Sequence, residues 1–137
     1  MLLLDDQNLT IELLKEDNAL LMTWNGYTSD SHYKHLLDEV YDLMKKHEIK
    51  KTLHDVSNHK GITPKSQDYA AEQSLAFSRQ HWDMEKRAMV FSPDQDVFSK
   101  FGIQRFVKKV EDADYNQQHR EFFDSLDEAK NWLLGKR

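Results

Sequence analysis

The sequence contains no cysteine. Disulfides, thiol nucleophiles and thiolate metal sites are therefore excluded, and oxygen and imidazole groups are left as candidate ligands or catalysts. Glycine and proline are scarce, with four and two residues among 137. We find no glycine-rich phosphate loop and no linker long enough to divide the chain. Residues 1–137 are expected to form a single domain.

Long hydrophobic runs and an excess of positive charge are also missing. The first apolar run, Met1 to Leu4, is stopped by Asp5 and Asp6. It is far shorter than the roughly 20 residues of a membrane span. The 24 acidic and 19 basic side chains give a net charge of −5, and the basic residues are scattered, which removes the main driving force for binding a phosphate backbone. We predict a cytoplasmic protein with no membrane span that does not bind nucleic acid.

Apolar residues are frequent enough for a compact core, at 39% of the chain, and their spacing predicts strands. Two apolar runs, at about residues 9–15 and 19–25, flank the turn-forming segment Glu16-Asp17-Asn18 and predict a β-hairpin. Three further strands are expected at about 50–56, 86–91 and 121–123.

Capping residues mark the starts of four helices. Thr28-Ser29-Asp30 precedes an amphipathic pattern over about 30–47, and Thr63-Pro64 begins a second helix that runs to about 79. Ser92-Pro93 begins a third helix, and Ser125 with Glu128 forms a capping box for the fourth. This order predicts an α/β fold with a mostly parallel sheet of four to five strands, an N-terminal β-hairpin and about four helices mainly on one face.

Several short motifs occur in a recognisable order along nearly the whole chain. They are Trp24-x-Gly26, a strand that ends in Asp55, the loop Gly61-Ile62-x-Pro64, the aromatic Tyr69 in the following helix, and the terminal segment FFDSLDEAKNWL at 122–133. In this order they resemble the SpoIIAA-like proteins, a bacterial family with the STAS-domain fold of anti-sigma-factor antagonists. The resemblance implies a non-catalytic α/β module that acts through a protein partner or binds an apolar ligand.

The resemblance also implies a place where a phosphorylation switch would lie. In the antagonists, a motif like D-S-S-G precedes the second helix, and its serine is phosphorylated by a partner kinase. Here the segment is Ile62-Thr63-Pro64-Lys65-Ser66, with no Asp-Ser pair and no following glycine. Ser57, Thr63 and Ser66 are the hydroxyls that a kinase would reach, although Thr63 is also explained as a helix N-cap.

The expected contact with a partner or ligand lies where the third strand ends, because α/β folds bind ligands beyond the carboxyl ends of parallel strands. It comprises Asp55, Ser57, Asn58, His59, Gly61, Thr63 and Ser66. Asp55 would serve as a general base or would fix the turn by accepting hydrogen bonds from loop amides. His54 and His59 leave a strand for a loop, so they are not a same-face metal pair. We predict no catalytic residue, no metal and no cofactor.

An alternative function is carriage or sensing of a small apolar molecule such as a lipid. An apolar set would line a cavity if the helices stand slightly away from the sheet. Its members are Met44, Tyr69, Phe77, Phe98, Phe101 and Phe106. Ordinary core packing is the competing interpretation of the same residues. An uncovered second face of the sheet would favour a homodimer.

Overall fold

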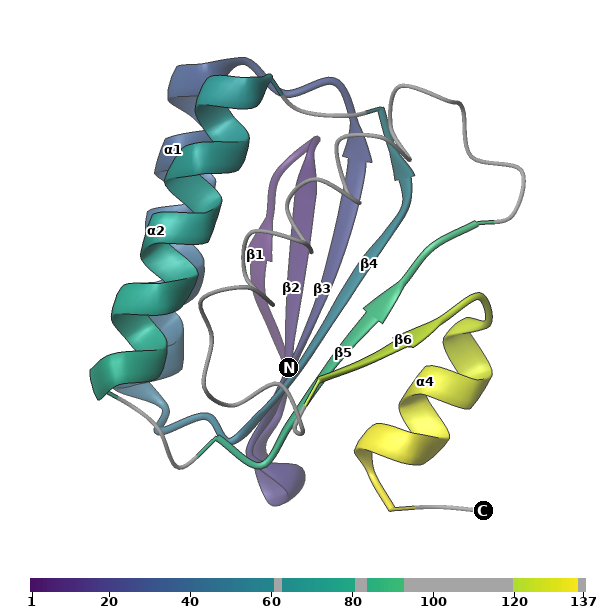
Figure 1. Cartoon of the computed structure of the whole chain (residues 1–137). Helices are drawn as coiled ribbons and strands as arrows, with labels where there is room; N and C mark the ends of the chain where they lie inside the picture. The colour runs from purple at the N-terminus through teal and green to yellow at the C-terminus, as the bar shows by residue number, and fades with distance from the viewer. Residues whose placement is uncertain (61–62, 81–83, 93–119, 136–137) are drawn as a thin grey trace.

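One six-stranded sheet organises the chain, with helices on both sides of it (Figure 1). The computed structural model describes residues 1–60, 63–80, 84–92 and 120–135. The strands, adjacent in chain order, are β1 Leu2–Asp5, β2 Leu9–Leu14, β3 Ala19–Gly26, β4 Lys51–His59, β5 Lys86–Val90 and β6 Arg120–Phe123. The helices are α1 Asp30–Lys46, α2 Pro64–Gln80 and α4 Leu126–Leu133, with a 3₁₀ turn at Lys15–Asp17.

The predicted N-terminal hairpin is confirmed as β2 and β3, which pair antiparallel. Asn18 closes the turn between them in the left-handed conformation, with φ of 52°, which asparagine tolerates better than most residues. The expectation of four to five strands is wrong, because Leu2–Asp5 forms an additional edge strand antiparallel to β2. The run of three leucines shows no alternation in the sequence, so its half-exposed strand pattern was not visible there.

The sheet is mixed rather than mostly parallel. Strands β3 to β6 pair parallel with one another, whereas β1 and β2 are antiparallel additions at one edge. Helix α1 connects β3 to β4 and helix α2 connects β4 to β5, as expected for crossovers between parallel neighbours. The carboxyl ends of β3 and β4 therefore lie at the same edge as the starts of α1 and α2 (Figure 1).

Three of the predicted helix caps are confirmed. The side chain of Ser29 accepts a hydrogen bond from the His32 amide, that of Thr63 from the Ser66 amide, and that of Ser125 from the Glu128 amide. Each cap satisfies an amide that the first helical turn leaves without a carbonyl partner. The third predicted helix, after Ser92-Pro93, lies outside the described residues.

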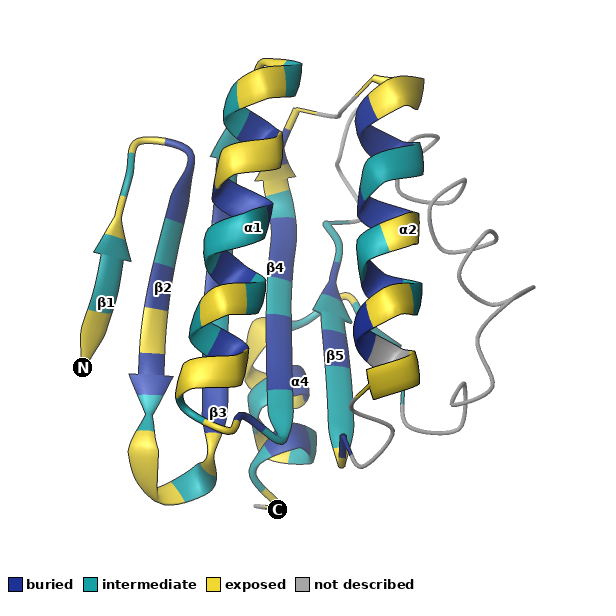
Figure 2. Cartoon of the chain, turned by 90° about the vertical axis from the view of Figure 1, so that its left-hand side faces the viewer, coloured by how far each residue is buried: buried dark blue, intermediate teal, exposed yellow. Residues whose placement is uncertain are grey.

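The helices do not gather mainly on one face, which corrects the prediction. Helices α1 and α2 pack side by side on one face with their exposed residues outward, and α4 covers the other face (Figures 1 and 2). Alternate strand residues make both faces apolar: Leu20 and Met22 belong to the core under α1 and α2, whereas Ala19 and Leu53 pack with α4. None of the helices in the described part of the chain is long and apolar enough to cross a bilayer.

Candidate functional site

The end of β4 is shaped by a β-bulge. Thr23 pairs with Asp55 and Asn25 pairs with Asn58, so β4 has one residue more than β3 between these two pairs. The strand continues to His59, which corrects the prediction that the loop begins after Val56. His54 and His59 are five positions apart, a spacing that would place them on opposite faces of a regular strand. Because the extra residue reverses the alternation of side chains, both face α1 and α2.

Asp55 stabilises this bulge. One of its carboxylate oxygens, Oδ1, accepts hydrogen bonds from the amide of Ser57 at 3.1 Å and from the Ser57 hydroxyl at 2.6 Å. The carboxylate is buried and Ser57 is half-buried. Of the two roles considered for Asp55, the geometry matches the one that fixes the local turn.

The Trp24-Asn25-Gly26 segment turns the chain from β3 toward α1. Gly26 has φ of +66°, a conformation that side chains disfavour, and it allows the chain to leave the strand there. The buried Asn8 stabilises the turn, because its side-chain nitrogen Nδ2 donates to the backbone carbonyl oxygens of Asn25 at 2.8 Å and Tyr27 at 3.0 Å. Trp24 is thereby fixed with its ring under α1, at 2% exposure.

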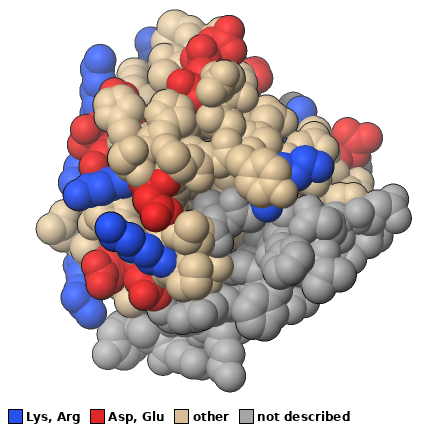
Figure 3. Space-filling view, turned by 90° about the horizontal axis from the view of Figure 1, so that it is seen from above, with Lys and Arg blue, Asp and Glu red and all other residues tan. Residues whose placement is uncertain are grey.

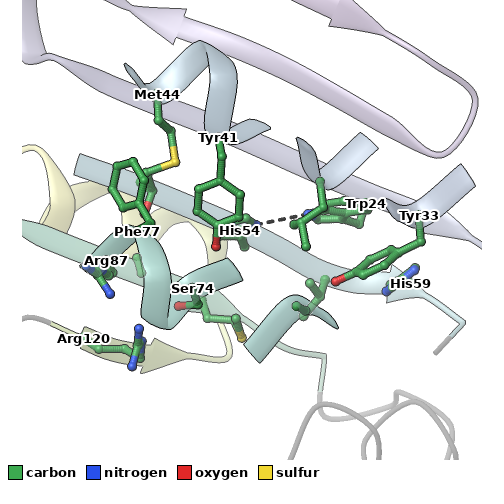
Figure 4. A pocket seen from close by; sticks show the side chains of 16 residues that line it. Trp24, Tyr33, Tyr41, Met44, His54, His59, Ser74, Phe77, Arg87 and Arg120 are labelled. Carbon is green, nitrogen blue, oxygen red and sulfur yellow. Dashed lines mark hydrogen bonds between the residues drawn. The ribbon is translucent and has the colours of Figure 1, made fainter. Parts of the chain in front are cut away.

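A cavity of about 100 Å³ lies between α1, α2 and the sheet (Figure 4). Its lining is mainly apolar and aromatic but includes hydroxyls, imidazoles and two guanidinium groups. The described residues that line it are Trp24, Tyr33, Leu37, Tyr41, Met44, Thr52, His54, Val56, His59, Ala70, Ser74, Phe77, Arg87, Ala88, Met89 and Arg120. A mostly apolar lining with a few polar groups is typical of small-molecule sites.

One end of the cavity is an aromatic wall. The ring of Trp24 lies 5.2 Å from that of Tyr33 and 5.7 Å from that of His59, measured between centroids. Tyr33 and His59 stack with their planes 14° apart. Such offset ring contacts add to the free energy gained from burial, so this end of the cavity is preorganised by packing rather than by flexible side chains.

The two imidazoles of the cavity are held neutral. Trp24 donates from Nε1 to Nδ1 of His54 at 3.1 Å, which places the imidazole proton of neutral His54 on Nε2 (Figure 4). Burial, together with the charges of Arg120 and Arg87, lowers the pKa of His54 to about 4. Burial also lowers the pKa of His59 to about 4. Near neutral pH, both rings act as uncharged donors or acceptors.

The opposite end of the cavity is cationic. Arg87 on β5 and Arg120 on β6 are paired neighbours in the parallel register, and both are half-buried. Figure 4 shows them together at one end, with Ser74 of α2 between them and the aromatic wall. Tyr41 lies over the middle, where burial raises the pKa of its phenol while Ser74 and the two arginines oppose that rise.

The hydroxyls at the start of α2 are tied to α1. Oδ1 of Asp30 accepts from the Thr63 hydroxyl at 2.5 Å and from the Ser66 hydroxyl at 2.7 Å. These two bonds, that of Thr63 first, lower the pKa of the Asp30 carboxyl. Ser66 is buried and Thr63 is exposed. The Asp30 carboxylate therefore joins the first turns of the two helices.

The residues predicted from the sequence divide into separate environments. Thr63 and Ser66 lie with Asp30 at the helix starts, Asp55 and Ser57 form the bulge, and Asn58 is exposed. His59 lies in the cavity wall. The predicted contact residues thus do not form one surface, and Gly61 lies outside the described residues.

The predicted apolar set is placed in part. Met44 and Phe77 line the cavity. Tyr69 does not, because its hydroxyl donates to Asp38 of α1 and the ammonium of Lys34 lies 5.2 Å from its ring centre. Phe98, Phe101 and Phe106 lie outside the described residues.

Sequence reasoning missed the polar members of the cavity, above all Arg87, Arg120 and Tyr41. A signal was present in the strand alternation: Arg87 shares a strand face with Met89, and Arg120 shares one with Phe122. A charged residue in an otherwise apolar strand position indicates a site facing inward with a specific role.

Comparison with solved structures establishes the fold. A crystal structure of an uncharacterized protein from the DUF3478 family, from Shewanella loihica PV-4 and described as having a SpoIIAA-like fold, matches with a TM-score of 0.53. The match covers 96% of this chain and 98% of that chain, at 17% sequence identity. This chain has a SpoIIAA-like fold.

The predicted SpoIIAA-like fold is therefore confirmed. An identity of 17% supports the architecture alone and carries no activity with it. No protein-family model matches the sequence, and no curated protein matches it.

Proposed function

We propose that this protein is a non-catalytic binding module whose SpoIIAA-like fold takes up a small, largely apolar molecule between the helices and the sheet. The observation that carries the proposal is the cavity, which combines an aromatic wall with a few fixed polar groups. Its volume of about 100 Å³ limits the part of a ligand that it encloses. A dry apolar cavity of about 150 Å³ holds benzene, so the ligand that fits here is of that size or smaller.

Native mass spectrometry of the protein isolated from its own host tests this proposal. A bound ligand is expected as a discrete adduct that is lost when the protein is denatured. The same spectrum reports the oligomeric state and any covalent phosphate on Ser57, Thr63 or Ser66. An adduct-free protein, isolated without denaturation at several concentrations, would count against ligand binding.

A cavity-filling variant provides the structural control. Ala70 lines the cavity from α2 and is 3% exposed, so Ala70→Leu places three additional carbon atoms inside it. Ala76 is exposed on the same helix, and Ala76→Leu is the matched variant. The first substitution should remove the adduct and the second should preserve it. Loss of the adduct in both variants, or in neither, would contradict binding in this cavity.

A second candidate function is regulation through a protein partner. The observation that favours it is a group of exposed side chains where β4 ends and α2 begins: Asn58, Lys60, Thr63 and Lys65. Figure 3 looks down onto the end of the molecule where α1 and α2 begin, and on its left-hand side, over these helices, acidic and basic side chains are interspersed. A mixed polar surface of this kind suits a reversible protein contact.

The partner surface is tested with the double variant Asn58→Ser and Lys60→Ser, which spares the buried His59 between them. We expect it to reduce capture of a specific protein from host lysate at least tenfold, measured by quantitative mass spectrometry. The matched control is Lys45→Ser with Lys46→Ser, two exposed lysines at the far end of α1. Equal capture by wild type and both variants would exclude this surface.

A further inference from the structure

One polar ring stands in the middle of the sheet face that borders the cavity. His54 lies on β4, and its register partners on the neighbouring strands are Met22 of β3 and Met89 of β5. Thr52 and Val56, two positions away along the same strand, also line the cavity. An imidazole is therefore placed among mainly apolar neighbours, where each of its nitrogens needs a hydrogen-bond partner.

The two nitrogens of His54 differ in what they contact. Trp24 donates to Nδ1 at 3.1 Å, which leaves the proton of the neutral ring on Nε2 (Figure 4). Within the part of the chain that the structure describes, no group forms a hydrogen bond with Nε2. His54 is half-buried although α1 and α2 cover this face, because part of its ring borders the open cavity. The Nε2–H group is thus a donor that a molecule in the cavity can use.

This donor selects a ligand atom that accepts a hydrogen bond. A carbonyl oxygen accepts and brings no proton of its own, whereas a hydroxyl or a primary amide brings a donor that needs a further acceptor. Met44, Phe77 and Met89 provide apolar surface in the same cavity. A molecule that combines one carbonyl group with an apolar body therefore matches both the donor and the lining.

We propose that the ligand of this cavity is a small ketone or aldehyde with an apolar body, whose oxygen accepts a hydrogen bond from Nε2 of His54. The inference rests on the proposed ligand-binding function and adds the chemical class of the ligand. Near neutral pH the ring is an uncharged donor, because its pKa, which burial lowers most, is about 4. The bond from Trp24 keeps the proton on Nε2 and fixes the orientation of the ring.

The test compares cyclopentanone with methylenecyclopentane, in which a CH₂ group replaces the oxygen and the shape is kept. Each is titrated into ¹⁵N-labelled protein, and the indole Nε1–H signal of Trp24 reports binding because this group lies in the cavity wall. A cavity without a donor would discriminate between the two as cyclohexane does, where nothing can hydrogen-bond. We expect the ketone to bind at least tenfold more tightly, relative to the alkene, than their partition from water into cyclohexane predicts.

The imidazole signals of His54 show directly whether the bond forms. Donation of a hydrogen bond moves the resonance of a protonated ring nitrogen to higher frequency. Nε2 should therefore resonate at higher frequency with the ketone bound than with the alkene bound, whereas Nδ1, which accepts from Trp24, should differ little between the two. This comparison uses the wild-type protein and decides the ligand class even if no variant at His54 folds.

Variants assign the preference to His54. His54→Asn keeps an oxygen close to the position of Nδ1, which can accept from Trp24, and has no atom at the position of Nε2. It should reduce the ratio of ketone affinity to alkene affinity several-fold, and an unchanged ratio would show that another group binds the oxygen. His35 is exposed on α1, and His35→Asn is the matched control that should keep the ratio. Circular dichroism selects the variants that fold.

Two kinds of result separate this inference from the function on which it rests. If Nε2 resonates at the same frequency with either ligand bound, or if the two affinities follow the partition into cyclohexane, the carbonyl inference fails while the binding function stands. If cyclopentanone, methylenecyclopentane and benzene all leave the Trp24 signal unchanged, the binding function fails as well.

Discussion

The two faces of the sheet are packed in different ways. On the α4 face, Ala19 and Ala129 are fully buried and Leu53 and Leu133 are 1% and 0% exposed. Small side chains allow the short helix to lie close to the strands, and the leucines fill the remaining space. The opposite face carries large aromatic rings, imidazoles, hydroxyls and two arginines, and a cavity remains among them.

The difference separates a face that stabilises the fold from a face that is equipped to bind. Polar groups inside a protein must be hydrogen-bonded, and they reduce the apolar contact that a core would otherwise gain. On the α1 and α2 face, buried polar groups have specific hydrogen-bond partners; for example, Trp24 donates to His54. A position whose side chain conflicts with simple packing is a sign of function, and most such positions among the described residues lie on the α1 and α2 face, with the buried Asp55 on the other.

The largest expected effect comes from truncating a side chain on each face of the same strand. Leu53→Ala should lower the free energy of unfolding by about 3 kcal/mol, because Leu53 is enclosed between the sheet and α4. Val56→Ala should cost about 1.5 kcal/mol, because it removes less and Val56 already borders a cavity. Urea denaturation measures both values. A loss at Val56 that equals the loss at Leu53 would show that the faces are packed alike.

A smaller effect per side chain is expected from acidification, which acts through the two histidines of the cavity face. The pKa of His59 is about 4 in the folded protein against 6.5 for a free histidine, so the unfolded chain takes up the proton first. Stability is therefore complete above about pH 6.5 and decreases as the pH falls toward 4. His54 contributes in the same direction. Each ring is expected to contribute about 2 kcal/mol of this loss between about pH 6.5 and pH 5.

Replacing the imidazole of His59 isolates its contribution to the loss of stability at low pH. His59→Phe keeps a planar ring beside Tyr33 and Trp24 and should lose less stability between about pH 6.5 and pH 5 than wild type does. His35 is exposed on α1, and His35→Gln should retain the wild-type slope. Denaturation midpoints across this pH range give the measurement, and identical slopes for all three proteins would show that His59 is not buried as a neutral ring.

Features with local signals were predictable from the sequence. The caps at Ser29, Thr63 and Ser125 each follow from a residue and the amide three positions later, and the hairpin follows from two apolar runs and an Asx-rich turn. Such signals depend on short segments whose geometry the surrounding fold does not alter. The order of the described elements after β1 follows from them, whereas the SpoIIAA-like fold was expected from the resemblance of the motifs to that family.

The candidate site depends on register and could not be predicted in the same way. The bulge that directs His59 into the cavity depends on how Asn58 pairs with Asn25, and the cationic end depends on the pairing of Arg87 with Arg120. Both pairings join distant parts of the chain. The sequence placed Asp55 at a strand end and His59 in the loop after it, whereas the bulge between them directs their side chains to opposite faces of the sheet.

The smallest effect on stability is expected from Asp30, whose carboxylate joins the first turns of α1 and α2 at the surface. The Asp30 carboxyl should titrate below the ordinary 3.8, because Thr63 and Ser66 donate to its ionised form. Its contribution to stability is therefore present above pH 3.8 and is lost as the pH falls through the lower folded pKa. Carbon-13 NMR of the carboxyl carbon gives the midpoint directly.

Substitutions at the two donors show whether this link joins α1 to α2. Thr63→Val should raise the midpoint of Asp30 more than Ser66→Ala does, because the Thr63 bond is the larger cause of the lowered pKa. Ser31→Ala changes an exposed hydroxyl next to Asp30 and should leave the midpoint where it is. If neither donor variant moves the midpoint, Asp30 does not hold the helix starts together. The two helices over the cavity would then be joined by their buried side chains and by the hydrogen bond from Tyr69 to Asp38, much as α4 is joined to the opposite face by buried side chains and by the bond from Lys86 to the Trp132 carbonyl.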